Sequence, residues 1–130
     1  MTRYAVGIGA RTGVRADAVR ALLDRILTEH ALDPADAVFA TVAARAGEPG
    51  LRDALGSDLT VWQPDELAAE QVPNPSSRTA VAVGTPSVAE AAALRTARTL
   101  PGATGADLVV PKSVGDGVTI ALARPVVEPP

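Results

Sequence analysis

The first 43 residues switch between strand-like and helix-like hydrophobic patterns. Tyr4 to Ile8 is a short apolar run typical of a buried strand, and it leads into a glycine-rich turn. Apolar residues then recur at helical spacing, which predicts an amphipathic helix over about residues 15 to 31. Ala37 to Ala43 is a second apolar run of strand length. This order predicts a βαβ unit, in which a right-handed crossover joins two parallel strands.

The remaining chain continues with short elements. We expect, in order, a helix over 49–55, a strand over Leu59–Trp62, a helical turn over Pro64–Ala69, a proline corner over Val72–Ser77, a helix that Ser76 or Ser77 caps and that ends near Gly84, a helix over 87–99, and a hairpin of Leu108–Val110 with Val118–Ala123. Ser87 and Glu90 have capping-box spacing, and Asp116-Gly117 favours the reversal of the hairpin. The prediction is one α/β domain over 1–124 with helices on both faces of a mixed sheet of about five strands, followed by a proline-rich tail over 125–130.

Composition excludes several kinds of site. Tyr4, Phe39 and Trp62 are the only aromatic residues, so a platform for stacking bases is not expected. The chain has no cysteine and one histidine, His30, which we interpret as a partner of a helix C-terminus. We therefore expect no metal site and no cofactor, and no Ser/His/Asp triad is recognisable. The net charge of -3 argues against a nucleic-acid partner.

Neither a targeting segment nor a membrane-spanning segment is expected in this sequence. MTRYAVGIGA lacks a cationic segment followed by an apolar one, so no signal peptide is expected. No apolar run approaches the roughly 20 residues that a membrane-spanning helix needs. We expect a cytoplasmic protein with no membrane partner.

The loop Gly7 to Gly13 lies where an α/β protein would hold an anion, because helix N-terminal amides point there. Its G-x-G-x-x-x-G spacing is one residue longer than the dinucleotide fingerprint, and no Gly-Lys-Ser/Thr follows. Three interpretations stay open: a nucleotide site, a plain strand-to-helix turn, and capture of a carboxylate or other anion. For the last, Arg11 and Thr12 would add donors to the amides of Gly9 and Gly13.

Two other segments carry candidate polar groups. Arg45 follows the second strand and can bind a carboxylate through two hydrogen bonds. Glu48, at a helix start, is either a partner of the helix dipole or a general base. Lys112 is the only lysine, so a specific role for its ammonium group is a further candidate. We expect Arg11, Arg45 and Lys112 to converge on one cleft.

Several segments together resemble one family, the cobalamin-biosynthesis CobE proteins, which are similar to the C-terminal domain of the cobalt-precorrin-5A hydrolase CbiG. The matching segments, in family order, are GIGARTG at Gly7–Gly13, RAGEPGL at Arg45–Leu51, VPNPS at Val72–Ser76, VGTPSVAEAAAL at Val83–Leu94, and VVPK with VTIALAR at Val109–Lys112 and Val118–Arg124. Asn74, Ser76 and Glu90 lie within these segments, and we add them to the candidate ligand-binding residues.

The resemblance implies a three-layer α/β/α fold and a role in corrin-ring synthesis. Two positions depart from the family pattern. The family commonly has Cys or Ser where Ala10 stands, and it usually has Lys where Arg45 stands. These departures exclude a thiol or hydroxyl role at position 10 and amine chemistry at position 45. The resemblance covers the short CobE type alone, without the other portions of the long hydrolase.

Three functions stay open at this point. The first is a protein that binds a carboxylated tetrapyrrole or corrinoid intermediate in an apolar cleft rimmed by arginines and backbone amides. The second is a lactone hydrolase acting on a precorrin, with Glu48 as general base and Lys112 or Arg11 polarising the carbonyl. The third is an interaction subunit whose partners are other enzymes of the pathway. The sequence does not decide whether the protein is an enzyme or a homo-oligomer.

Overall fold

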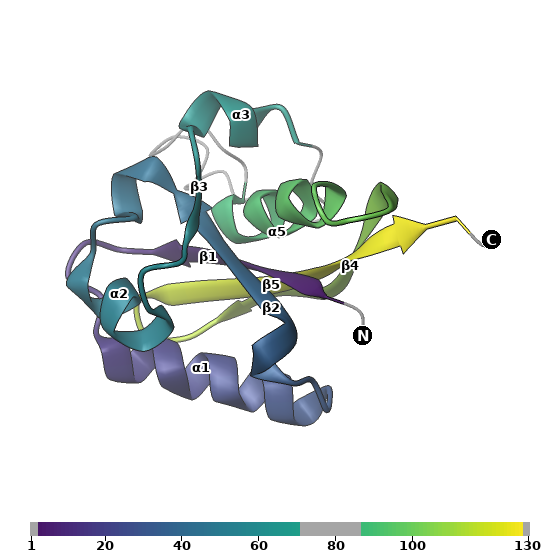
Figure 1. Cartoon of the computed structure of the whole chain (residues 1–130). Helices are drawn as coiled ribbons and strands as arrows, with labels where there is room; N and C mark the ends of the chain where they lie inside the picture. Colours follow the sequence, from purple (N-terminus) through teal and green to yellow (C-terminus); the bar gives the residue numbers. More distant parts are fainter. Residues whose placement is uncertain (1–2, 71–86, 129–130) are drawn as a thin grey trace.

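A βαβ unit forms the centre of the fold, as the sequence predicts. In the computed structural model, which describes residues 3–70 and 87–128, β1 (Tyr4–Ala10) pairs in parallel with β2 (Ala37–Val42), and α1 (Ala16–Glu29) joins them (Figure 1). A 3-10 turn, Pro34–Asp36, leads into β2. The five apolar residues that define the helical period are all buried on the sheet side of α1: Val19, Leu22, Leu23, Ile26 and Leu27.

The described part of the chain forms one sheet of five strands in the order β3-β2-β1-β5-β4. β3 (Thr60–Trp62) is parallel to β2. β4 (Ala103–Val114) and β5 (Val118–Val127) form an antiparallel hairpin, and β5 also pairs antiparallel with β1. The sheet is therefore mixed, and the expected hairpin is confirmed.

Helices cover both faces of this sheet (Figure 1). α1 packs with α2 (Pro49–Leu55) on one face, and α5 (Val88–Arg98) lies with α3 (Pro64–Ala68) on the other. The expected three-layer α/β/α architecture is confirmed. No helix in residues 3–70 and 87–128 is long and apolar enough to cross a bilayer.

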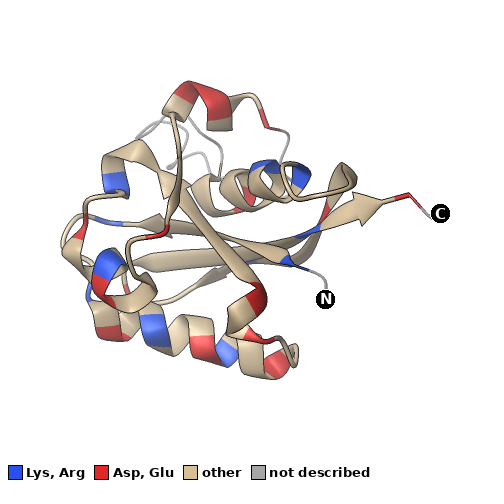
Figure 2. Ribbon diagram, viewed as in Figure 1, with Lys and Arg blue, Asp and Glu red and all other residues tan. Residues whose placement is uncertain are grey.

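The two faces of the sheet have different cores. Aliphatic side chains of α1, α2 and the strands fill the first, while acidic and basic residues share the outer side of α1 (Figure 2). The second core is built largely of methyl groups on α5: Ala89, Ala91, Ala92, Ala93 and Ala97 are all 0–1% exposed. These small residues let α5 lie very close to β1, where a Cβ on Gly7 would fall 2.5 Å from Ala93 N. Gly7 is thus required by close packing of a helix on a strand.

Charged side chains attach α3 to α5. The Arg95 guanidinium lies 4.9 Å from the centre of the Trp62 ring, and its Nη2 is 3.6 Å from Glu66 Oε2. Arg98 donates to the buried carboxylate of Glu70. These contacts join the segment after β3 to the helix that covers the second core, so we interpret this cluster as structural.

The hairpin departs from expectation at two places. β5 continues to Val127, so residues 125–127 of the expected tail pair with β4 instead. Beyond Ala123 this strand has passed the start of β1 and is paired on one side only, where a proline such as Pro125 is tolerated. β4 also extends from Ala103 to Val114, beyond the expected strand Leu108–Val110 at both ends, and its ladder has register shifts, two of which flank Val110.

The predicted helix start at Ser87 is confirmed. Ser87 is the N-cap of α5, and its Oγ accepts a hydrogen bond from the backbone N–H of Glu90 at 3.4 Å. The expected proline corner over 72–77 and the helix ending near Gly84 lie outside the described residues, as do Asn74 and Ser76.

A pH-dependent prediction concerns Tyr4, which is 3% exposed and whose hydroxyl donates to the Asp33 carbonyl at 2.8 Å. Burial, and then the charges of Asp36 and Asp33, raise the pKa of Tyr4 above its usual value. Because the folded state holds this proton more tightly, Tyr4 contributes stability that is complete below pH about 10 and is lost as the pH rises through the folded pKa.

We therefore expect Tyr4→Phe to lower the free energy of unfolding by about 1 kcal/mol at neutral pH and to remove this part of the alkaline loss. Urea unfolding at neutral and alkaline pH measures both effects. Tyr4 is the only tyrosine, so tyrosinate absorbance reports its titration alone. A titration at the pKa of free tyrosine would contradict the prediction.

Candidate functional site

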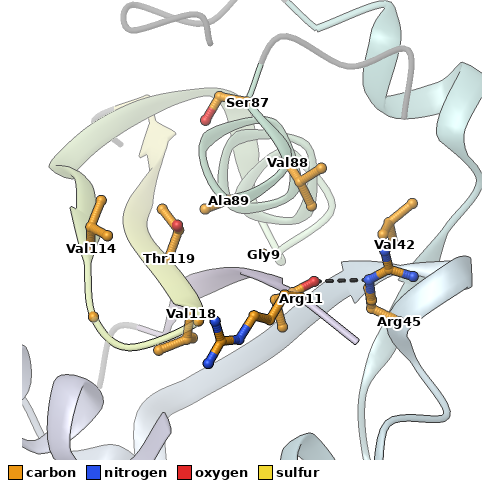
Figure 3. Close-up of a pocket in the computed structure, with 13 residues that line it drawn as sticks. Gly9, Arg11, Val42, Arg45, Ser87, Val88, Ala89, Val114, Val118 and Thr119 are labelled. Carbon is orange, nitrogen blue, oxygen red and sulfur yellow. Dashed lines mark hydrogen bonds between the residues drawn. The ribbon is translucent and has the colours of Figure 1, made fainter. Parts of the chain in front are cut away.

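A pocket of about 400 Å³ lies where β1 and β2 end. Gly9 and Ala10 at the end of β1 form part of its wall, with the reversal that precedes β5 on one side and the first turn of α5 above (Figure 3). The crossover helix of β1 covers one face of the sheet and α5 covers the other. Open α/β sheets bind ligands at such a place, outside the carboxyl ends of their strands.

The wall of the pocket is mainly aliphatic, with a few polar groups. Val42, Val88, Val114 and Val118 contribute apolar surface. Ser87 and Thr119 add two hydroxyl groups. Because Ser87 starts α5, the positive end of that helix dipole lies at the pocket, where it favours a negative charge.

Among the residues that the structure describes, the wall has two cationic side chains, and the first, Arg45, is held in place by the backbone. Its Nε donates to the Ala10 carbonyl at 2.8 Å, and its Nη1 is 3.3 Å from the Ala44 carbonyl (Figure 3). These bonds use two of the five N–H groups of the guanidinium, so the others remain available to a ligand. The bond to the Ala10 carbonyl places Arg45 next to the loop that follows β1.

Arg11 is the other cationic residue, and Figure 3 places it beside Val118, whereas Arg45 lies beside Val42. Its side chain is 66% exposed, and its Nη2 is 3.4 Å from Asp116 Oδ1. The two arginines thus flank the apolar wall instead of meeting at one point.

The backbone amides of the glycine loop are largely engaged within the protein. Gly13 N–H donates to Glu48 Oε1 at 2.8 Å, Arg11 N–H to the Gly117 carbonyl at 3.0 Å, and Val14 N–H to the Arg11 carbonyl at 3.2 Å. An incoming anion would have to displace these bonds. The geometry therefore favours the arginines over the loop amides as ligand contacts.

The two carboxylates singled out from the sequence bind backbone groups. Glu48 joins the first loop to the start of α2 through Gly13. Glu90 is fully buried, and its Oε2 accepts from the Lys112 N–H at 2.9 Å. That amide lies within the irregular part of the β4 ladder, so a buried carboxylate satisfies it.

Among the described residues, the wall includes Gly9, Arg11 and Arg45 of the predicted set. Thr12, Gly13, Glu48, Glu90 and Lys112 lie outside it. The structure brings Arg11 and Arg45 to one pocket as expected, while Lys112 is not part of the wall.

The sequence analysis did not select Val114 and Thr119, which line the pocket, or Asp116, which contacts Arg11 beside it. Their proximity to the first loop follows from the antiparallel pairing of Ala10 with Val118. Thr119 is paired with Gly9 in the same ladder. The sequence predicts a reversal at Asp116-Gly117, but local patterns do not show that this reversal lies beside the end of β1.

The fold and the site define an α/β domain with an apolar pocket flanked by arginines at the carboxyl edge of its parallel strands. The chain belongs to the family described as cobalamin synthesis G C-terminus, whose profile matches residues 4–123. This confirms the family that its motifs resemble.

Solved structures that are similar to this chain include three cobalamin-related proteins. CobE, described as a protein from the cobalamin (vitamin B12) biosynthetic pathway, is 36% identical with a TM-score of 0.86, and the match covers 98% of this chain and 94% of that one. The cobalamin biosynthesis protein chiG from Agrobacterium tumefaciens str. C58 is 28% identical, with a TM-score of 0.67 and coverage of 94% and 98%. A putative cobalamin biosynthesis protein G homolog from Sulfolobus solfataricus, 22% identical with a TM-score of 0.66, shares the fold over 94% of this chain and 36% of its own. No curated protein matches this chain in sequence.

Proposed function

We propose that this protein acts in cobalamin biosynthesis by binding a carboxylated corrinoid intermediate at the pocket between β1, β5 and α5. The observation that carries the proposal is that Arg11 and Arg45 lie on either side of an aliphatic pocket wall in a member of this family. Corrinoid intermediates are complementary to this arrangement, because their carboxylates surround an apolar macrocycle. Each arginine would take one carboxylate, with the valines against the ring.

The size of the pocket limits how much ligand it can enclose. About 400 Å³ is near the lower end of the range for pockets that enclose drug-sized molecules. A corrin macrocycle is larger, so one edge and its carboxylates would enter while the remainder lies outside. Arg11, which is largely exposed, is suited to a carboxylate at the rim.

The wall favours binding over catalysis. Arg11 and Arg45 are its only titratable side chains among the described residues, and neither can serve as a general base at neutral pH. Glu48 and Lys112, the residues for a lactone hydrolase, lie outside this wall. The proposal also includes a cytoplasmic location and contacts with other enzymes of the pathway, which co-purification from the native host would detect.

Titration with hydrogenobyrinic acid tests the proposal. We expect a saturable change in the absorbance of the corrinoid, and at least about tenfold weaker binding of its fully amidated derivative, which lacks the carboxylates. The amidated compound is the matched control for contact with the ring alone. No spectral change, or equal affinity for the two compounds, would overturn the proposal.

A further inference from the structure

We infer that Asp116 limits the affinity of this pocket for anions, because its carboxylate competes with the ligand for Arg11. The inference rests on the proposed function, and it concerns how tightly the site holds an anion. Arg11 Nη2 lies 3.4 Å from Asp116 Oδ1. Gly115 and Gly117, on either side of Asp116, line the pocket, whereas Asp116 does not. The competing carboxylate therefore lies at the rim and draws Arg11 outward.

The backbone brings Arg11 to the reversal. The Arg11 N–H donates to the Gly117 carbonyl at 3.0 Å, which joins the loop after β1 to the turn before β5. The side chain of Arg11 then crosses Gly117 so closely that a Cβ there would fall 2.5 Å from Nε. Gly117 also has a φ of +74°, which favours glycine at this position. The backbone of Arg11 is thus held beside the reversal that carries Asp116.

The ion pair is exposed enough to exchange. The side chains of Arg11 and Asp116 are 66% and 76% exposed, and pairs of this kind are weak because water screens them. A ligand carboxylate that bonds Arg11 through two oxygens can replace Asp116, which the structure shows with one oxygen on one nitrogen. Asp116 therefore lowers the affinity for any anion that binds through Arg11.

Asp116→Asn tests this inference without disturbing the turn, since Asn-Gly favours the same reversals as Asp-Gly. We expect about threefold to fivefold tighter binding of hydrogenobyrinic acid at low ionic strength, and a smaller gain at high salt. Asp107→Asn is the matched control, because Asp107 is exposed on β4, outside the pocket wall, and loses the same charge. This control should bind like the wild type.

A second pair of variants separates local competition from general charge. In an Arg11→Gln background, Asp116→Asn should give no gain, because the group for which the ligand and Asp116 compete is absent. An equal gain with Asp107→Asn, or a gain that persists without Arg11, would overturn the inference while the proposed function stands. If Asp116→Asn bound hydrogenobyrinic acid with the affinity of the wild type, the inference would likewise be overturned while the proposed function stands. Failure of the wild type to bind would overturn both.

Discussion

Gly7→Ala is expected to lower the free energy of unfolding by about 3 kcal/mol, the upper part of the usual range for overpacking. An added Cβ would lie 2.5 Å from Ala93 N and closer still to the Ala89 carbonyl oxygen. Both are backbone atoms of α5, so the clash cannot be relieved by rotating a side chain. The helix would have to move away from the sheet and give up the packing of its buried alanines.

Two glycines nearby are matched controls. Gly47→Ala places a Cβ in open space and should change stability by less than about 0.5 kcal/mol. Gly9→Ala should also be mild, because its closest contact would be an ordinary 3.6 Å approach to Val88 Cβ. Urea unfolding of the three variants gives the comparison. Equal losses in all three would mean that glycine is needed in β1 and its surroundings for reasons other than the approach of α5.

Arg45→Gln is expected to weaken binding of hydrogenobyrinic acid by about tenfold to a hundredfold, the usual effect of removing one charge-assisted contact. Arg45 is partly buried and held by the Ala10 carbonyl, so its charge is already oriented before the ligand arrives. Arg11→Gln should have a smaller effect, because the Arg11 side chain is mostly exposed and solvent screens it.

Controls for Arg45 come from a second arginine and from a conservative change. Arg124→Gln removes the same charge from an exposed position on β5 outside the pocket wall and should leave affinity unchanged. Arg45→Lys keeps the charge and should recover part of the affinity, but it loses the fork that binds both oxygens of a carboxylate. If Arg124→Gln weakened binding as strongly as Arg45→Gln, the net charge of the protein, and not this pocket, would account for the effect.

The local patterns of the sequence predict most of the fold. The apolar spacing in α1 identifies the face that packs on the sheet, and Ser87 marks the start of α5. The extent of β5 was missed because Pro125 reads as a breaker, whereas its place at the end of the sheet makes it compatible with the strand.

The candidate site was predicted less completely, because long-range pairing decides which residues meet. Arg11 and Arg45 follow the carboxyl ends of neighbouring parallel strands, so their proximity could be inferred from the βαβ unit. Glu48 and Glu90 could not be assigned in this way, since their carboxylates accept hydrogen bonds from N–H groups of Gly13 and Lys112 in other segments. Hydrogen bonds between distant segments have no signature in local spacing.

The two edges of the sheet also restrict how copies of this chain could associate. β3 offers only three residues for pairing with another strand. β4 is longer, but its register shifts and Pro111, which lacks an N–H, interrupt the straight row of donors and acceptors that another strand would need. Extension of the sheet from one molecule into the next is thus disfavoured at both edges of the described sheet, and we expect any assembly of copies to use the helical layers or the loops.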